Sequence, residues 1–367
     1  MKKVGIQTPH YANNYGAQLQ AYALGEAIKK TGFNIEYIDR RPCLLEHRNL
    51  LKRIIKKLEL NTSKRGFKDF ETKYINPKSI KITDNKDYKL LDCKKYYAIV
   101  VGSDQIWRDD YFLSSFEYSP YLYYVKDKNI RKISYAASFG KNNCKQPEER
   151  RKNIAYLLKD FWAISVREKS GVNILNEEFG VKGVWVLDPT LLHKSSFYIE
   201  SLHLVKLNKE RDEIVTYILG GDKVKYEKMS AVAQSMGLSI RHIYNRKHYS
   251  QTSLGRLLAK FVKIPSVVDW LDLILNAKYV ITDSFHGMVF SIIFNKQFVV
   301  LNNIGGGTER YLSLLKEIGL EDRLLEWNVD ENVIMQKLED VIDYNQCYKL
   351  LDEAVSSSLE YLKISLS

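Results

Sequence analysis

Cysteine is scarce in this sequence and forms no recognisable pattern. Only four cysteines occur in 367 residues, and no two of them make a Cys-x-x-Cys pair. This spacing excludes the usual zinc-binding patterns and the disulfide framework of small secreted domains. The four are Cys43, Cys93, Cys144 and Cys347. We therefore expect the chain to fold in a reducing compartment, and we predict a cytoplasmic protein.

Long hydrophobic runs and the common catalytic signatures are also missing. No stretch approaches the roughly 18 apolar residues of a membrane-spanning helix, and Met1 leads into a strand-like run without an apolar leader. The sequence contains no HExxH, no Walker A lysine loop, no GxSxG elbow and no kinase set. Residues that bind metals are not grouped at usable spacing. We therefore expect neither a metal nor a cofactor.

Positive charge is in excess. The chain has 56 Lys and Arg against 44 Asp and Glu, which gives a net charge of +12 and favours anionic partners. Basic residues concentrate in the stretch 44–68, where Lys52, Arg53, Lys56 and Lys57 lie between apolar residues at helical spacing. A basic amphipathic helix of this kind lies on an anionic membrane surface or packs its apolar stripe on the protein. The sequence leaves both readings open.

Strand-like runs alternate with helical patterns along most of the chain. This alternation is typical of an α/β fold with parallel sheets, and the length favours two domains. The predicted strands are 3–8, 35–38, 97–101, 131–137, 163–166, 184–187, 213–219, 238–242, 279–281 and 298–301. The predicted helices are 17–30, 148–160, 223–236, 266–277, 309–318, 329–342 and 348–364. We expect two Rossmann-like, doubly wound domains facing a cleft.

The predicted domain boundary lies near residue 190. The N-terminal domain, 1–190, would bind the acceptor of a group-transfer reaction and carry the helical insertion 44–68. The C-terminal domain, 191–367, would bind the donor, and its last helix, 348–364, would cross back onto the first domain.

One stretch, 279–291, combines a buried strand with the start of a helix. Thr282, Asp283 and Ser284 are all good helix N-caps, which puts His286 in the first helical turn, just beyond a strand. Open α/β sheets bind ligands at that edge, and helix N-termini favour anions. His286 there is either a proton-transferring residue or one that merely packs. Asp283 either orients it or caps the helix.

Polar residues follow other predicted strands. Arg167 is either a bidentate clamp for an anion or a salt-bridge partner. The loop Gly305–Gly307, with Arg310 beyond it, either cradles a phosphate or is simply flexible. Asp104 with Trp107 and Arg108 suits a sugar, with a carboxylate for its hydroxyls and an indole for its face; otherwise Asp104 caps a following helix.

Five segments taken together resemble the polysaccharide pyruvyl transferase family. They are Asn-Tyr-Gly-Ala-Gln-Leu-Gln-Ala-Tyr-Ala-Leu at 14–24, Val-Gly-Ser-Asp-Gln-Ile-Trp at 101–107, Ser-Val-Arg-Glu at 165–168, Asp-Pro-Thr at 188–190 and Thr-Asp-Ser-Phe-His-Gly at 282–287. The resemblance implies a glycosyltransferase-B-like fold. It also implies transfer of pyruvate from phosphoenolpyruvate onto two sugar hydroxyls as a cyclic ketal, in surface polysaccharide biosynthesis such as that of a capsule or exopolysaccharide.

The resemblance also implies site residues. His286 would be the catalytic histidine, with Asp283 beside it, and Arg167 would contact the donor. Many members have an arginine where this chain has Ser284, so Arg310 or Lys263 would substitute for it. We expect donor contacts from Arg167, Ser284, Gly305, Gly306, Gly307 and Arg310. We expect acceptor contacts from Asn14, Tyr15, Gly16, Asp104, Trp107, Arg108 and Ser138.

Two other functions stay open at this point. One is a nucleotide-sugar glycosyltransferase of the same architecture, and the other is a non-catalytic protein that binds glycans or lipid headgroups. The partners we expect are phosphoenolpyruvate and a sugar acceptor, and no nucleic acid. A polyprenyl-diphosphate-linked oligosaccharide as acceptor, and contact of 44–68 with the cytoplasmic membrane face, are further expectations.

Overall fold

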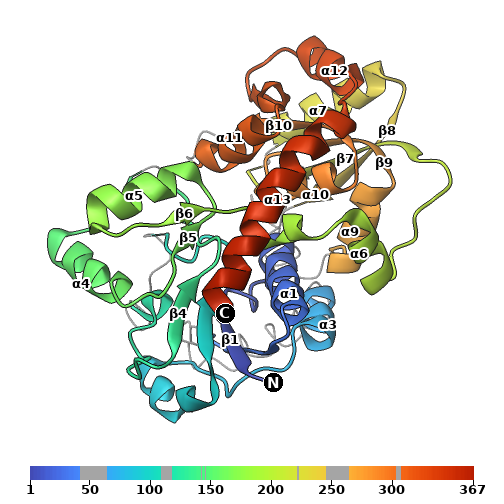
Figure 1. Ribbon diagram of the computed structural model, residues 1–367. Helices are drawn as coiled ribbons and strands as arrows, with labels where there is room; N and C mark the ends of the chain where they lie inside the picture. Colours follow the sequence, from blue (N-terminus) through green and yellow to red (C-terminus); the bar gives the residue numbers. More distant parts are fainter. Residues whose placement is uncertain are drawn as a thin grey trace, which may run out of the picture. The chain divides into compact units, whose positions relative to one another are not determined.

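The chain divides into two compact units (Figure 1). The computed structural model describes residues 1–41, 64–108, 118–141, 143–144, 146–220, 223–244, 264–302 and 307–367. The described residues of the first unit lie within Met1–Glu46, Glu71–His193 and Leu350–Ser367. Those of the second unit lie within His47–Phe70 and Lys194–Lys349.

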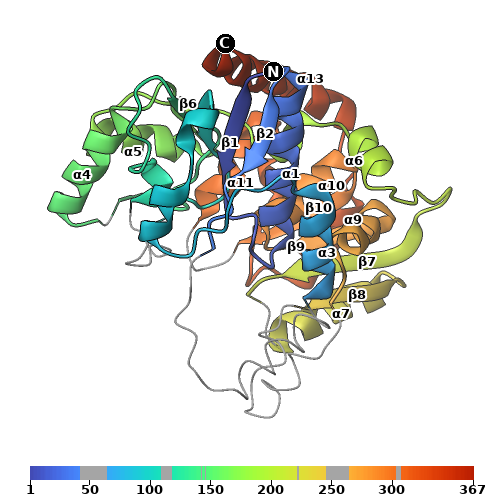
Figure 2. The same cartoon turned by 90° about the horizontal axis from the view of Figure 1, so that it is seen from below.

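The first unit is built on a parallel four-stranded sheet in the order β2-β1-β3-β4. Its strands are β1 (Lys3–Gln7), β2 (Asn34–Tyr37), β3 (Ala98–Val101) and β4 (Arg131–Ser134), and a parallel pair follows, β5 (Ser165–Val166) and β6 (Val184–Trp185). Every residue of β3 is apolar and buried, as expected for a central strand covered on both faces. Helix α1 (Tyr15–Lys30) accompanies β1 and β2 (Figure 2).

The second unit contains a parallel five-stranded sheet in the order β11-β10-β9-β7-β8. Its strands are β7 (Arg211–Ile218), β8 (Ser239–Tyr244), β9 (Ala277–Thr282), β10 (Gln297–Asn302) and β11 (Leu324–Glu326). Ile214, Ile281 and Val299 from neighbouring strands share one buried cluster with residues of the covering helices. The apolar strands therefore form the centre of this unit, and polar residues collect where the strands end.

The remaining elements connect and cover the sheets. The other α-helices are α3 (Arg65–Tyr74), α4 (Glu148–Leu158), α5 (Lys169–Phe179), α6 (Ser195–Ser201), α7 (Lys223–Ser235), α9 (Val267–Leu275), α10 (Phe285–Ile293), α11 (Thr308–Glu317), α12 (Glu331–Glu339) and α13 (Tyr344–Leu366). The short 3-10 helices are η1 (Asn85–Leu90), η2 (Cys93–Lys95), η5 (Ser119–Tyr121), η6 (Pro189–Leu192) and η8 (Glu321–Arg323). Among the described residues, no helix has both the length and the apolar character needed to cross a bilayer.

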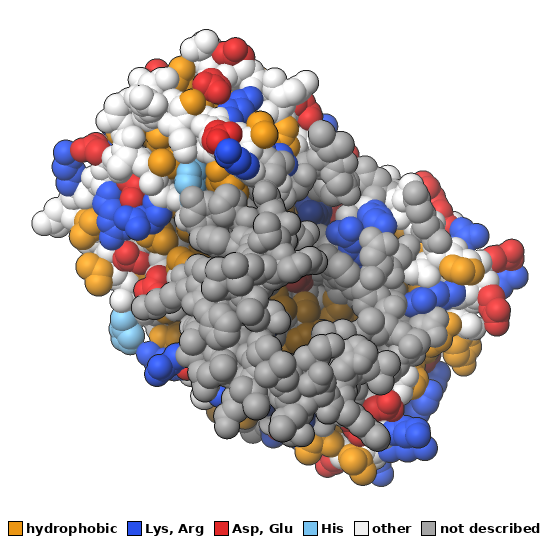
Figure 3. Space-filling view, turned by 180° about the vertical axis from the view of Figure 1, so that it is seen from behind, with side chains coloured by type: hydrophobic (Ala, Val, Ile, Leu, Met, Phe, Trp, Pro, Cys, Tyr) orange, Lys and Arg blue, Asp and Glu red, His pale blue; other side chains and the backbone are white. Residues whose placement is uncertain are grey.

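The prediction of an α/β fold with parallel sheets is confirmed, and each predicted strand has a counterpart. The edge strand β11 was not predicted. The basic stretch 44–68 lies outside the described residues except for the part from residue 64 onwards, and Lys263, Gly305 and Gly306 lie outside them as well. Over much of the described surface in Figure 3, Lys and Arg side chains lie beside Asp and Glu side chains.

Candidate functional site

The start of α10 determines where His286 lies. Ser284 is the N-cap, and its Oγ accepts a hydrogen bond from the Gly287 N–H at 3.3 Å. His286 is the second residue of the helix and only 7% exposed, and its ring stands edge-on to Phe285. The prediction that His286 lies in the first turn beyond a strand is therefore confirmed, and the cap is Ser284 rather than Asp283.

Gly287 is required by a close approach between this helix and β9. A Cβ at Gly287 would lie 2.4 Å from Thr282 Oγ1, far inside van der Waals contact. That oxygen already donates to the Tyr217 carbonyl at 2.7 Å and accepts from the Ser284 N–H at 3.0 Å. The glycine therefore lets the helix begin directly on the strand end, which fixes the backbone that carries His286.

Asp283 connects the ends of two neighbouring strands. Its carboxylate accepts hydrogen bonds from the N–H groups of Leu219 and Gly220, just beyond β7, and its carbonyl accepts one from the Tyr311 hydroxyl at 2.6 Å. Burial raises the pKa of Asp283, and the two backbone N–H groups only partly oppose that shift. These contacts give Asp283 a structural task beside its predicted catalytic one.

The described part of the glycine-rich loop lies at the start of α11. Gly307 has φ +107°, in the left-handed region, and immediately precedes the helix. Arg310 donates through Nε to the Gly307 carbonyl at 3.4 Å, and its guanidinium lies 5.7 Å from the centre of the Tyr311 ring. Binding of a phosphate by this loop stays a prediction.

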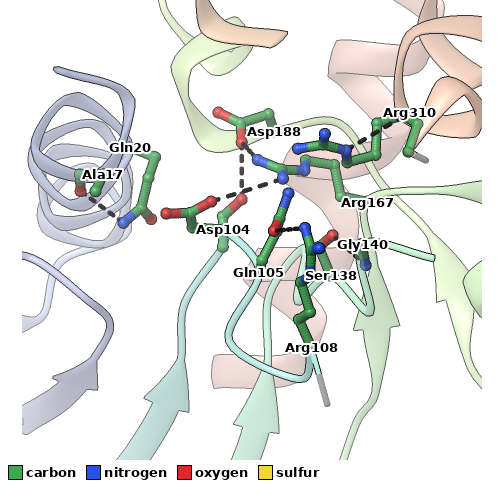
Figure 4. Close-up of polar contacts among 12 residues, drawn as sticks. Ala17, Gln20, Asp104, Gln105, Arg108, Ser138, Gly140, Arg167, Asp188 and Arg310 are labelled. Carbon is green, nitrogen blue, oxygen red and sulfur yellow. Dashed lines mark hydrogen bonds and ion pairs between the residues drawn. The ribbon is translucent and has the colours of Figure 1, made fainter. Parts of the chain in front are cut away.

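Arg167 lies in a buried polar network of the first unit (Figure 4). It follows β5 and is 3% exposed. Its Nη1 donates to Asp188 Oδ2 at 2.8 Å, and its Nη2 lies 3.8 Å from Asp104 Oδ1. Burial opposes the charged guanidinium, but the nearby carboxylates, Asp188 foremost, outweigh it and raise the pKa of Arg167. The side chain is thus both the predicted clamp and a salt-bridge partner of this unit's own acids.

Asp188 is the anchor of this network, a role that the sequence did not reveal. Its Oδ2 also accepts from Ser103 Oγ at 2.7 Å, and its Oδ1 accepts from Thr190 Oγ1 at 2.6 Å and from the Thr190 N–H at 3.1 Å. Asp188 is therefore a fully bonded, buried carboxylate. The sequence signal was the Asp-Pro-Thr segment at 188–190, which is one of the five segments that carry the family resemblance.

Asp104 differs from Asp188 because its carboxylate is accessible. Its side chain is 25% exposed, and its backbone has φ +74°, which is unusual for a residue with a side chain. Its carbonyl accepts from the Ser138 N–H at 3.1 Å, so the loops after β3 and β4 hold it in place. Strained backbone is often found at functional sites. No helix begins in the described residues immediately after Asp104, so it does not cap one there.

Ser138 is bonded to a carboxylate that we had not predicted. Glu168 is 1% exposed, and its Oε1 accepts from Ser138 Oγ at 2.9 Å and from the N–H groups of Phe139 and Gly140 at 2.7 and 3.1 Å. Ser138 is itself fully buried. In this structure it therefore binds Glu168 and holds the loop after β4 rather than presenting its hydroxyl to a sugar.

The expectation that Trp107 offers a face to a sugar is corrected by the structure. The indole is fully buried, donates through Nε1 to the Pro120 carbonyl at 3.1 Å and stacks on Tyr121. It belongs to a cluster of buried apolar and aromatic residues that forms a hydrophobic core of the first unit. Arg108, next in sequence, donates through Nη1 to Gln105 Oε1 at 2.8 Å.

A cavity of about 290 Å³ lies beside Asp104 at the carboxyl edge of the first sheet. It brings Asn14 and Asp104 from the predicted set together with Arg40, which we had not predicted. Asn14 is the N-cap of α1 and accepts from the Ala17 N–H at 3.0 Å, and the next two residues, Tyr15 and Gly16, are buried in the first turn. The lining is Pro9, Tyr11, Ala12, Asn14, Ala17, Arg40, Asp104, Gln105, Ile106 and Pro120.

Solved structures similar to this chain share its two-unit α/β architecture. A UDP-GlcNAc 2-epimerase from Neisseria meningitidis matches with a TM-score of 0.58 and 11% identity over 99% of both chains. A glycosyltransferase from Rickettsia africae matches with a TM-score of 0.51 and 12% identity, covering 100% of this chain and 96% of the other. The predicted glycosyltransferase-B-like fold is thereby confirmed. At these identities the likeness concerns the fold alone.

Sequence comparisons give a closer relationship. General stress protein 30 of Bacillus subtilis is 25% identical over 199 residues, which are 54% of this chain and 53% of that protein. The match therefore spans only about half the length of that curated relative. The family model described as polysaccharide pyruvyl transferase matches residues 14–305, a range that takes in the segments of both units described above.

Proposed function

The chain belongs to the polysaccharide pyruvyl transferase family, a family of transferases that modify polysaccharides, and we propose that it forms pyruvate ketals from phosphoenolpyruvate. In this reaction the three-carbon unit moves onto two hydroxyls of one sugar, and inorganic phosphate leaves. The single observation that carries the proposal is His286 in the first turn of α10, beyond the end of β9, within the matched range.

The chemistry needs a proton at a carbon atom. The methylene carbon of phosphoenolpyruvate takes up a proton, and the neighbouring carbon becomes electrophilic. One sugar hydroxyl adds there and loses its proton, phosphate departs, and the second hydroxyl closes the ring. We assign proton transfer to His286, because histidine exchanges protons near neutral pH. The contact between Gly287 and Thr282 fixes the backbone that carries His286. This supports the role, since proton transfer requires a positioned group.

The donor is a small, highly charged anion, so its site requires positive charge and N–H donors. The N-termini of α10 and α11 supply both, with Ser284 and Gly307 at these ends and Arg310 one turn into α11. We also assign a donor contact to Arg167, through Nη2, the nitrogen that lies 3.8 Å from Asp104 Oδ1. The hydrogen bond from Nη1 to Asp188 holds the guanidinium in one orientation, which prepares it to bind an anion.

The acceptor requires hydrogen-bond acceptors for its hydroxyls. We assign it to the cavity at the carboxyl edge of the first sheet, which is lined by the partly exposed Asp104 and by Asn14 at the start of α1. We assign to the Asp104 carboxylate, which lies 3.8 Å from Arg167 Nη2, the role of accepting a hydroxyl proton. The cavity volume of about 290 Å³ suits a small ligand such as a single sugar ring.

The proposal is tested by incubating the purified protein with phosphoenolpyruvate and a panel of sugar acceptors. We expect phosphate to be released only when an acceptor is present, and the acceptor to gain the mass of one pyruvate ketal. Parallel incubations with nucleotide sugars test the competing glycosyltransferase activity through release of nucleoside diphosphate. Acceptor binding without any product would favour a non-catalytic glycan-binding protein.

A further inference from the structure

Gln20 is a buried polar side chain. No role is assigned to it by the sequence analysis or by the family match. It lies on α1, one turn beyond Ala17, and is fully buried. Its Nε2 donates to Thr8 Oγ1 and to the Ala17 carbonyl, both at 2.7 Å. Thr8 in turn donates to the Ser103 carbonyl at 3.3 Å. The amide is therefore anchored to the same loops that carry Asp104.

These contacts fix which way the amide points. A backbone carbonyl only accepts hydrogen bonds, so the amino group must be the end that faces Ala17. The Thr8 hydroxyl uses its own proton on Ser103, so it too accepts from Gln20. Both amide hydrogens are then engaged, and Oε1 must point away from α1.

The Oε1 atom is left as a buried acceptor. It has no hydrogen-bond partner in the described part of the chain, although buried polar atoms in folded proteins nearly always have one. Figure 4 shows the Gln20 amide and the Asp104 carboxylate pointing toward one another. Ala17 and Asp104 both line the cavity assigned to the acceptor. Two oxygen acceptors thus point toward one another in Figure 4, and the Asp104 carboxylate belongs to the cavity lining.

We propose that Gln20 Oε1 is the second hydroxyl-binding group of the acceptor site, beside Asp104. The inference rests on the proposed function, because a ketal needs two neighbouring hydroxyls of one sugar. Asp104 accepts a hydrogen bond from one of them and Gln20 from the other, which holds the pair in register for ring closure. The substrate class is a pyranose with two free hydroxyls close enough to close one ketal ring.

An amide suits this position better than a second acid. A carboxylate beside Asp104 would place two like charges together and oppose ionisation of both. A neutral amide supplies the acceptor without that repulsion. Because Oε1 is shielded from water, a sugar lacking the matching hydroxyl leaves it unpaired, and buried sites of this kind discriminate strongly against such analogues.

The test compares binding of methyl galactopyranoside, methyl glucopyranoside and methyl N-acetylmannosaminide, each with all of its monodeoxy forms, by calorimetry without phosphoenolpyruvate. For the sugar that binds best, we expect loss of either hydroxyl of one neighbouring pair to weaken binding to the wild type by at least about tenfold. Gln20→Leu should bind the parent sugar more weakly and become insensitive to the loss of one of the two hydroxyls. Gln18→Leu, the same change two residues away on another side of α1, should keep the wild-type pattern.

Other outcomes separate the two proposals. Equal sensitivity of Gln20→Leu and the wild type to both deoxygenations would overturn the role of Gln20. Wild-type protein that binds no pyranoside, or binds every deoxy form as well as its parent, would overturn it without any variant. Sugar binding with the expected deoxy pattern but no phosphate release would contradict the ketal-forming reaction and leave the hydroxyl pair standing.

Discussion

At the scale of single residues, the polar network of the first unit is built on a buried ion pair. In the first unit, Arg167 and Asp188 are both almost completely buried and bonded to each other. Such a pair is costly to break, because removal of one partner leaves an uncompensated charge. Conservative changes therefore test function here more cleanly than alanine does.

The role of His286 is tested by His286→Asn. We expect kcat to fall by at least about 10²-fold, since general acid–base groups contribute 10²–10⁴-fold, with little change in thermal stability. His203→Asn is the matched control, because His203 is exposed and has φ +55°, a conformation that asparagine tolerates. More than roughly a tenth of the wild-type kcat in His286→Asn would contradict the assignment.

The role of Arg167 is tested by Arg167→Lys, which keeps the charge beside Asp188 and removes the fork. Loss of one charge-assisted hydrogen bond of about 1.5–3 kcal/mol should raise the KM for phosphoenolpyruvate by roughly 10- to 100-fold. Arg151→Lys, in the partly exposed pair with Glu178, should leave that KM unchanged. An effect on acceptor use alone would move Arg167 away from the donor.

At the scale of elements, close packing of Gly287 positions the start of α10 against β9. Gly287→Ala would force a Cβ against Thr282 Oγ1, and such overpacking costs on the order of 1–3 kcal/mol. Urea unfolding should show this loss. The double variant with Thr282→Ala should lose less than the sum of the two single changes, because the clash is then absent. Strictly additive losses would show that the contact does not matter.

His193 joins η6 to α1. Its Nε2 donates to the Ala23 carbonyl at 2.8 Å, and its Nδ1 lies 3.3 Å from Lys30 Nζ and accepts from it. Burial, with help from Lys30, lowers the pKa of His193 from 6.5 to about 4. Between these values the unfolded chain binds a proton that the folded chain does not, so stability falls as the pH drops from 6.5 towards 4.

This pH dependence gives a prediction for the free energy of unfolding. The loss should approach about 1.4 kcal/mol per pH unit inside that window, and the contribution should be complete above pH 6.5. His193→Gln can donate to Ala23 and accept from Lys30 without titrating, so its profile should be flatter than that of the wild type. Parallel profiles for the two proteins would contradict the assignment to His193.

The sequence predicted elements better than partners. Strands such as β3 and β9 are short apolar runs, and the start of α10 carries its own cap, so local patterns were sufficient. The tasks of Asp188, Glu168 and Gln20 depend on contacts between segments far apart in the chain, which no local pattern contains. Trp107 was misjudged for the same reason, since an indole in a polar motif gives no sign of whether it faces the core.

At the scale of the whole molecule, the basic stretch 44–68 still predicts association with anionic surfaces. Basic residues near an anionic membrane contribute about 1 kcal/mol each. Glu at Lys52, Arg53, Lys56 and Lys57 together should therefore weaken sedimentation with anionic vesicles at low salt. Added salt should reduce binding of the wild type itself. Equal partitioning of the two proteins would leave this stretch without a membrane role.

The central claim is that the protein transfers pyruvate from phosphoenolpyruvate as a ketal, with a proton added at the methylene carbon. The most direct measurement is the reaction run in D₂O with a sugar acceptor, followed by proton and phosphorus NMR. The account predicts one inorganic phosphate for each ketal formed, and a ketal methyl group that carries one deuterium from the solvent. A sugar product that retains an intact enol ether, or product formed only from a nucleotide sugar, would contradict it.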